Sequence, residues 1–230
     1  MRRDFVLLAT SCVVVLGCDA TSLDVEMPLD APLSFALPLA EPELFGQVLA
    51  IDHDPQVYDG IWRVNCLDYD GRSFPWCYDE HDGVDYLLES GFEAMDAGST
   101  EIWAAADGVV FDTEDGNYDR CHGDVETGEV DCDGYEQRSN FVTLEHSTGH
   151  RTLYWHMQKG SVAVSVGDWV EQGAVLGRVG SSGTSTTPHL HFELQDADGM
   201  SLDPYAGPES HDDSWWCVQG ESEGLPGYCD

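Results

Sequence analysis

The strongest constraint on the fold is a series of short apolar or alternating runs, separated by glycine, between Ile102 and Leu194. Val, Tyr, Trp and Thr dominate these runs, turn residues recur about every 8–12 positions, and no segment keeps a long amphipathic helical period. Strand-forming residues at this spacing predict antiparallel strands joined by short turns. The sequence therefore predicts a mainly β protein with a single compact antiparallel β-sheet domain. The runs are I-W-A-A-A-D-G-V-V-F, N-F-V-T-L-E-H, R-T-L-Y-W-H-M, S-V-A-V-S-V-G-D-W-V and A-V-L-G-R-V-G.

The charge of the chain excludes one broad class of function. Asp and Glu number 44 against 9 Lys and Arg, which gives a formal net charge of −35. Such a chain repels nucleic-acid phosphates, so a nucleic-acid partner is not expected. Hydrophobic residues still make up 42% of the chain, with 7 Trp, and this content predicts a packed core rather than a disordered protein.

The first residues predict export. Two arginines precede an apolar run from Phe5 to Leu16, which is too short to cross a bilayer of about 30 Å and typical of a signal peptide. The run ends in V-L-G-C, which resembles the lipobox of bacterial lipoproteins. We predict a signal peptide over residues 1–17, lipidation of Cys18 and an acidic, Pro-rich tether over residues 18–45. The protein would be an exported lipoprotein of the bacterial cell envelope, facing the periplasm or the surface, and a secreted protein without lipid is the alternative.

Export also decides how the cysteines are interpreted. Six of the 8 Cys remain beyond Cys12 and Cys18, and an even number in an exported chain is typical of a disulfide framework. Six cysteines can pair in many ways, and pairing between neighbours is the simplest prediction. A zinc site made of thiolates is disfavoured because no C-x-x-C spacing occurs. The neighbours are Cys66 and Cys77, Cys121 and Cys132, and Cys217 and Cys229; the last pair lies in a tail, residues 207–230, that we expect to pack on the domain.

Four residues stand out among the candidates for chemistry. His189 and His191 lie two apart in the strand-like run P-H-L-H-F-E-L, so both imidazoles point to one face of a sheet, although two strand histidines without a role fit the spacing equally well. His81 and Asp85 lie four apart, about 13 Å in an extended strand, which is too far for two ligands of one zinc. Gly83 between them would permit the bend that brings them together. His156, which ends the run L-Y-W-H-M, is a fifth candidate.

Taken together, the motifs resemble one known family. H-D-G-V-D, A-A-A-D-G-V-V, L-Y-W-H-M, V-G-D-W-V-E-Q-G-A-V-L-G and S-S-G-T-S-T-T-P-H-L-H-F-E follow one another in the order found in the lysostaphin-type (LytM-type) zinc metallopeptidases. The resemblance covers about residues 79–193. It implies a compact antiparallel β domain with the site in a groove above the larger sheet, within residues 46–206 here, and peptidoglycan peptides as the usual substrate.

The resemblance also implies roles for individual residues. His81, Asp85 and His191 would bind one zinc ion, and His156 and His189 would form the catalytic pair beside it. Two imidazoles and one carboxylate leave zinc a position for water, as in catalytic sites. Residues Thr184 to Thr187 would form the turn that leads into the H-L-H strand. No pattern argues for an obligate oligomer, so a monomer is expected.

One segment departs from the family pattern. Residues 112–136 resemble an insertion that carries Cys121 and Cys132, and we expect it near the groove, where it could narrow the substrate range. Its sequence E-V-D-C-D-G-Y-E loosely resembles a calcium loop, but Glu129 and Asn140 stand where Asp and Glu are expected, so calcium is a weaker candidate ligand. We expect His146 to be structural and the remaining histidines, His53, His122, His150 and His211, to face solvent.

Three functions remain open from the sequence. The first is a zinc metalloendopeptidase that cleaves stem peptides or cross-links of peptidoglycan. The second is a non-catalytic envelope module that binds peptidoglycan or activates an amidase, although members of the family that only regulate amidases typically lack some zinc ligands, and here all five positions are filled. The third is a zinc protease that acts on extracellular proteins.

Overall fold

The computed structural model describes residues 32–56, 64–98, 100–124, 126–222 and 224–230. The predicted signal peptide, residues 1–17, and the predicted lipidation site Cys18 lie outside these ranges. Among the described residues, no helix has the length and apolar composition needed to cross a membrane.

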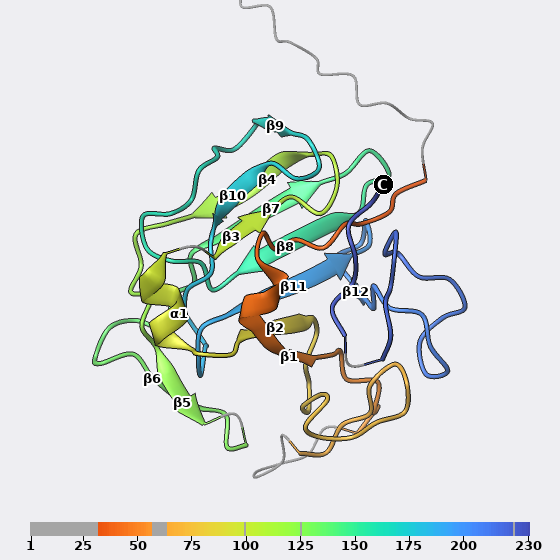
Figure 1. Cartoon of the computed structure of the whole chain (residues 1–230), viewed down its shortest axis with the longest axis horizontal. Coiled ribbons are helices and arrows are strands. Elements are labelled where there is room, and N and C mark those ends of the chain that lie inside the picture. The colour runs from red at the N-terminus through yellow and green to blue at the C-terminus, as the bar shows by residue number, and fades with distance from the viewer. Residues whose placement is uncertain (1–31, 57–63, 99, 125, 223) are drawn as a thin grey trace, which may run out of the picture.

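Most strands belong to one antiparallel sheet (Figure 1). The strand order is β1-β2-β11-β8-β7-β4-β9, and β12 adds to β11. The strands are β1 (Phe45–Leu49), β2 (Val84–Leu88), β4 (Gly108–Glu114), β7 (Phe141–Glu145), β8 (Arg151–Trp155), β9 (Trp169–Val170), β11 (His189–Gln195) and β12 (Ser201–Leu202). This sheet confirms the mainly β prediction.

Smaller elements complete the domain. Two further antiparallel pairs are β3 (Glu101–Trp103) with β10 (Val175–Arg178), and β5 (His122–Asp124) with β6 (Glu129–Asp131). Within the described ranges, the helical segments are the 3-10 turn η1 (Pro42–Leu44) and the short helix α1 (Phe92–Ala97). One predicted strand run, residues 161–170, is strand only at Trp169–Val170. Two of its backbone N–H groups, those of Val162 and Ser165, bond to the side chains of Asp115 and Asp168 instead of a neighbouring strand.

The two faces of the main sheet carry different side chains. Along β11, Leu190, Phe192 and Leu194 alternate with His189, His191 and Glu193, and all six are buried. Alternation along a strand sends the two sets to opposite faces. The apolar set packs into the core with residues such as Tyr154, whose ring meets that of Phe192 edge-on at 5.4 Å. The histidine set therefore lies on the other face of the same strand.

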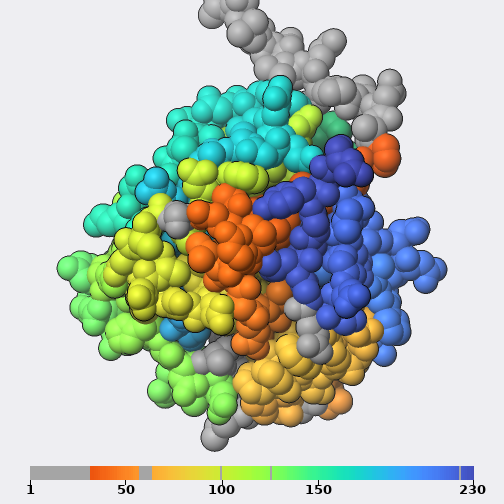
Figure 2. All heavy atoms as spheres, viewed as in Figure 1, coloured from red at the N-terminus to blue at the C-terminus, as the bar shows by residue number. Residues whose placement is uncertain are grey.

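The apolar face is covered by the segment before β1. Phe35 and Leu39 are fully buried and Leu37 is 2% exposed. The ring of Phe35 lies 6.0 Å from that of Phe192, and its backbone N–H donates to the Trp215 carbonyl at 2.7 Å. Figure 2 shows the residues around this segment in orange, between the yellow and dark blue parts of the chain.

The end of the predicted tether, residues 18–45, is therefore corrected: its last part belongs to the domain. Residues 35–39 form a run of five buried positions, and Phe45 already belongs to β1. A run of five residues that are all buried does not alternate between apolar and polar side chains, so its sequence shows no strand or helix period. Its backbone is held on two sides, by Ala105 and by the C-terminal tail.

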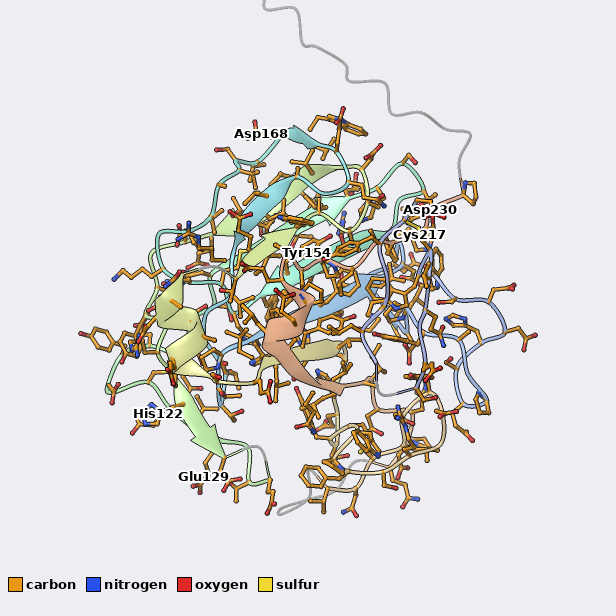
Figure 3. The ribbon with its side chains drawn as sticks, in the orientation of Figure 1. His122, Glu129, Tyr154, Asp168, Cys217 and Asp230 are labelled. Carbon is orange, nitrogen blue, oxygen red and sulfur yellow. A yellow bond between two sulfur atoms is a disulfide. The ribbon has the colours of Figure 1, made fainter. Side chains whose placement is uncertain are left out.

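The C-terminal tail packs on the domain, as expected. The side chain of Trp216 is 4% exposed, and the backbone of Trp216 forms a parallel β-bridge with that of Phe35. The structure joins the cysteines as neighbours, in the pairs Cys66–Cys77, Cys121–Cys132 and Cys217–Cys229. Figure 3 places Cys217 and Asp230 together at one edge of the molecule, and His122 and Glu129 on the β5–β6 hairpin at another.

Candidate active site

Strand pairing brings two of the predicted ligands together. In the antiparallel register of β2 and β11, Asp85 lies directly opposite His191, and Leu87 lies opposite His189. Side chains directly opposite one another on neighbouring strands have Cβ atoms about 4.5–5.5 Å apart on the same face. Asp85 and His191 therefore meet although 106 residues separate them in the chain.

His81 completes a group of three ligand atoms. Its Nε2 lies 3.2 Å from Asp85 Oδ1 and 3.3 Å from His191 Nδ1, and His191 Nδ1 lies 2.9 Å from the same carboxylate oxygen. A tetrahedral zinc with ligand bonds of about 2.0–2.1 Å needs ligand atoms about 3.3 Å apart. All three side chains are buried. The spacing and the donor set fit a small cation such as zinc.

A backbone contact fixes the tautomer of His81. Its Nδ1 lies 2.8 Å from the carbonyl oxygen of Ala50, which can only accept, so Nδ1 carries the proton. The lone pair of Nε2 is then free to face Asp85 and His191. The ring also stacks on Tyr78, whose hydroxyl donates to the second oxygen of Asp85 at 3.0 Å.

Gly83 lies at a bend just before β2, where a bend was predicted, and it is required there for a second reason as well. It is absent from the residues with positive φ, so no left-handed bend depends on it. A Cβ at this position would instead lie 2.5 Å from Cε1 and 2.6 Å from Nε2 of His191. The glycine leaves room for the imidazole ring, and the approach of His81 to Asp85 comes from the loop before β2.

His156 and His189 stand beside this group with matching hydrogen bonds. Their ring centroids are 4.6 Å apart, and each Nδ1 lies 2.7 Å from a carbonyl oxygen, that of Ser182 for His156 and that of Thr187 for His189. Each Nδ1 must therefore donate, which leaves each Nε2 as an acceptor. The Nε2 of His189 lies 3.5 Å from Asp85 Oδ1, so it faces the candidate metal ligands.

Burial and charge set the protonation of these groups. Burial would raise the pKa of Asp85, but the surrounding imidazoles of His81, His189 and His191 hold that pKa well below its ordinary value. Burial, together with the neighbouring His189 and His191, lowers the pKa of His156 well below its ordinary value. Burial also lowers the pKa of His189. The carboxylate is thus ionised and both imidazoles are neutral, which is the state in which an imidazole can accept a proton.

Several supporting residues were not predicted from the sequence. Tyr78 contacts Asp85, Ser139 Oγ lies 3.4 Å from His156 Nδ1, and Ser185 Oγ lies 3.2 Å from His189 Nδ1. Asp82 Oδ1 lies 3.7 Å from His191 Nε2, the ring nitrogen that does not face Asp85. Asp82 lies within H-D-G-V-D and Ser185 within the T-S-T-T turn, which is the only signal for them, and no sequence pattern marks Ser139.

The site opens into two neighbouring concavities. One is lined by Asp85, His189, Tyr78 and Leu87, and the other by His156, Ser139 and Trp155. Thr184 lines both, so we call the two together the groove. The predicted insertion reaches both parts, because Val130 of β6 lines the first and Glu114 lines the second. Gln137 and Arg138, just beyond the insertion, also line the second.

The remaining histidines lie elsewhere. His146 is buried, with Nδ1 2.8 Å from the Asp107 carbonyl and Nε2 2.8 Å from the Thr152 hydroxyl, in keeping with a structural role. His53 is partly buried and pairs with Asp203 at 2.8 Å rather than facing solvent alone. His122 is exposed and close to Asp131 and Asp133, in the segment predicted to resemble a calcium loop. These side chains, all exposed, also hold hydrogen bonds with their own loop.

Comparison with known proteins places the motifs in one family. Residues 79–204, more than half of the chain, match the model of peptidase family M23. The chain is 34% identical over 114 residues to the peptidoglycan DD-endopeptidase ShyC of Vibrio cholerae, which covers 50% of this chain and 20% of that protein. It is 34% identical over 113 residues to the glycyl-glycine endopeptidase ALE-1 of Staphylococcus capitis, covering 49% of this chain and 24% of that protein.

Among solved structures, the catalytic domain of the antimicrobial peptidase lysostaphin from Staphylococcus simulans is 28% identical, with a TM-score of 0.36, over 55% of this chain and 77% of that domain. The chain thus spans less than a quarter of the length of the two curated relatives.

Proposed function

Because the chain belongs to peptidase family M23, we propose that it is a zinc-dependent metalloendopeptidase that hydrolyses peptide bonds in the stem peptides or cross-links of peptidoglycan. The observation that carries the proposal is the convergence of His81, Asp85 and His191 at tetrahedral spacing, with His156 and His189 beside them. The related endopeptidases ShyC and ALE-1 support the substrate class.

In this proposal His81, Asp85 and His191 hold one zinc ion. When bound, zinc supplies Lewis-acid polarisation of the scissile carbonyl and of the attacking water. The ionised carboxylate offsets part of the positive charge, and the Ala50 carbonyl keeps the Nε2 lone pair of His81 directed at the site. Such contacts between a histidine ligand and a backbone carbonyl orient the ring and raise its basicity.

His156 and His189 move the protons. Both present an unprotonated Nε2, because their Nδ1 protons are held by the carbonyls of Ser182 and Thr187. The pair can accept the proton of the attacking water, donate a hydrogen bond to the developing oxyanion and return a proton to the leaving amine nitrogen. Burial keeps both rings neutral before the reaction, as a general base requires.

The location of the enzyme is part of the proposal. A signal peptide over residues 1–17 would direct export, and a lipid on Cys18 would hold the protein at the bacterial cell envelope, close to peptidoglycan. The protein would act there as a monomer. The tether would then be residues 18 to about 34, since the following residues are buried in the domain.

The direct test uses the full-length chain in detergent, loaded with zinc and incubated with purified peptidoglycan. New peptide termini, identified by mass spectrometry, should disappear with a chelator and fall by about three orders of magnitude in His191→Ala, which removes a zinc ligand. His150→Ala, which changes a histidine outside the groove, is the matched control and should keep its activity. Zinc binding at one ion per chain without any cleavage of peptidoglycan would contradict the enzyme and favour the non-catalytic module; cleavage of extracellular proteins alone would favour the third function.

A further inference from the structure

We propose that Arg138 recognises a carboxylate of the peptide substrate beside the scissile bond. The inference rests on the peptidase function proposed above and deepens it, because it names a chemical feature that the substrate must carry. Arg138 lies just beyond the inserted segment, outside the motifs that define the zinc site.

The location of Arg138 connects it to the catalytic pair. It lines a concavity of about 270 Å³ together with His156, Trp155 and Thr184. The next residue, Ser139, approaches Nδ1 of His156 at 3.4 Å. Because Arg138 and His156 line the same concavity, a group bound by Arg138 belongs to a part of the substrate close to the scissile bond.

The charge at this position is exceptional for the chain. Among the residues that line the two parts of the groove, Arg138 is the only cation, while the chain as a whole carries a formal charge of −35. An anionic peptide approaching such a protein is repelled by most of its surface. Apart from the zinc ion of the proposed site, this guanidinium is the one cationic group that the lining of the groove offers such a peptide, and Glu114 beside it is the one carboxylate that lines the same part of the groove.

The guanidinium is held in place but not saturated. Glu114 Oε1 lies 2.6 Å from Nη2 of Arg138 and also accepts a hydrogen bond from Asn117 at 2.9 Å, which anchors the carboxylate. Arg138 and Glu114 are 57% and 34% exposed, and an exposed ion pair of this kind contributes little to stability. A guanidinium has five N–H donors in a planar fork that suits bidentate binding of a carboxylate, so donors remain for a ligand.

A second unused donor lies in the same concavity. The indole N–H of Trp155 is buried and has no hydrogen-bond partner in the described part of the chain. Its ring centroid lies 6.1 Å from that of His191. Buried donors are rarely left without an acceptor in proteins. A ligand oxygen bound next to Arg138 would supply one once the indole ring turns its N–H toward the concavity, because this nitrogen has almost no accessible surface in its present position.

The test compares binding of two ligands that differ only in charge. Muropeptide dimers are released from peptidoglycan by a muramidase, and one portion is converted from carboxylates to carboxamides. Dissociation constants are measured by calorimetry with full-length, zinc-loaded His189→Ala, which keeps the three zinc ligands but does not cleave. The same titrations are run with two double variants, in which His189→Ala is combined with Arg138→Gln or with Arg151→Gln. Arg151→Gln is the matched control, because Arg151 pairs with Glu145 outside the groove.

We expect Arg138→Gln to weaken binding of the carboxylate form by about tenfold or more, as for a lost charge-assisted hydrogen bond. Binding of the carboxamide form should change less than about twofold in Arg138→Gln, and Arg151→Gln should leave both unchanged. In the cleaving enzyme, Arg138→Gln should raise KM for the carboxylate form with little change in kcat.

Two outcomes overturn the inference in distinguishable ways. Equal affinity for the carboxylate and carboxamide forms, unaltered by Arg138→Gln, removes the role of Arg138 and leaves the peptidase function standing. Failure of the zinc-loaded protein to bind either form removes peptidoglycan peptides as the substrate, and with them both proposals.

Discussion

Both faces of β11 are buried, but one carries apolar side chains and the other carries polar ones. Phe192 and His191 are neighbours in the chain, and both are buried, yet one faces the hydrophobic core and the other faces the groove. The apolar face is buried by the chain itself, through Phe35 and Trp216. On the histidine face the buried imidazoles and carboxylate have polar partners, as in the contact between His191 Nδ1 and Asp85 Oδ1 at 2.9 Å.

The two faces should therefore respond differently to substitution. Side chains on the apolar face stabilise the fold by removing apolar area from water. Buried polar groups contribute little net stability, because their hydrogen bonds replace those they made with water. Changes to the first face should lower the free energy of unfolding, and changes to the second should lower metal affinity and activity.

The largest effect is expected where the cover of the apolar face is removed. A chain that begins at Glu41 lacks Phe35, Leu37 and Leu39, each worth about 2–5 kcal/mol when buried. The sum approaches the whole stability of a typical domain, about 5–15 kcal/mol, so this chain should not fold. Circular dichroism and urea unfolding measure the result.

A chain that begins at Pro32 is the control for that truncation, because it keeps every buried residue that the structure describes. If the chain beginning at Glu41 unfolded at the same urea concentration as the one beginning at Pro32, residues 35–39 would not cover the core.

The sharpest contrast uses the two neighbours on β11. Phe192→Ala should lower the free energy of unfolding by about 3–5 kcal/mol, because it leaves a cavity between Tyr154, Phe35 and Trp216. His191→Ala, compared in the presence of a chelator, should cost only about 1 kcal/mol. Urea titrations measure both changes. Equal losses of stability in the two variants would show that the faces do not differ as described.

Gly83 tests the histidine face without changing a ligand. Gly83→Ala places a methyl group against the His191 ring, and the displaced ring should weaken zinc binding by about 10–100-fold, as other disturbances around a metal ligand do. Competition with a metal indicator measures the affinity. Gly46→Ala is the control, since its added methyl group meets only the flexible Glu89 side chain. Unchanged zinc affinity in Gly83→Ala would contradict the close approach.

The smallest effect concerns the one histidine packed against the apolar face. Burial lowers the pKa of His146 below 6.5, so the unfolded chain binds a proton that the folded chain does not. Stability from this group is therefore present above pH of about 6.5 and is lost as the pH falls through the folded-state pKa. Between about pH 7 and pH 5, wild type should lose about 1 kcal/mol more stability than His146→Gln.

Urea unfolding at both pH values checks this, and the site histidines are common to both proteins, so their contribution cancels. His122→Gln on the exposed hairpin is the control and should follow wild type. A steeper loss in His146→Gln than in wild type would reverse the sign and contradict a neutral, buried His146.

Much of the molecule could be predicted from its sequence. The β content follows from the runs between Ile102 and Leu194, and the family from the order of H-D-G-V-D, L-Y-W-H-M and H-L-H-F-E. These features are local: strand periodicity and motif order are written in residues close together in the chain. Pairing of neighbouring cysteines is local as well, and the structure shows the same pairs.

What the tertiary structure decided depends on residues far apart. The register of β2 with β11 sets Asp85 opposite His191, and the carbonyls of Ala50, Ser182 and Thr187 fix which nitrogen of each imidazole is free. A carbonyl is present at every residue, so no sequence pattern marks the one that will accept. Residues 35–39 resemble a linker by composition, and only the exposed apolar face of the sheet makes them core. Strand patterns determine which residues can be buried, whereas packing between distant segments determines which partners they meet.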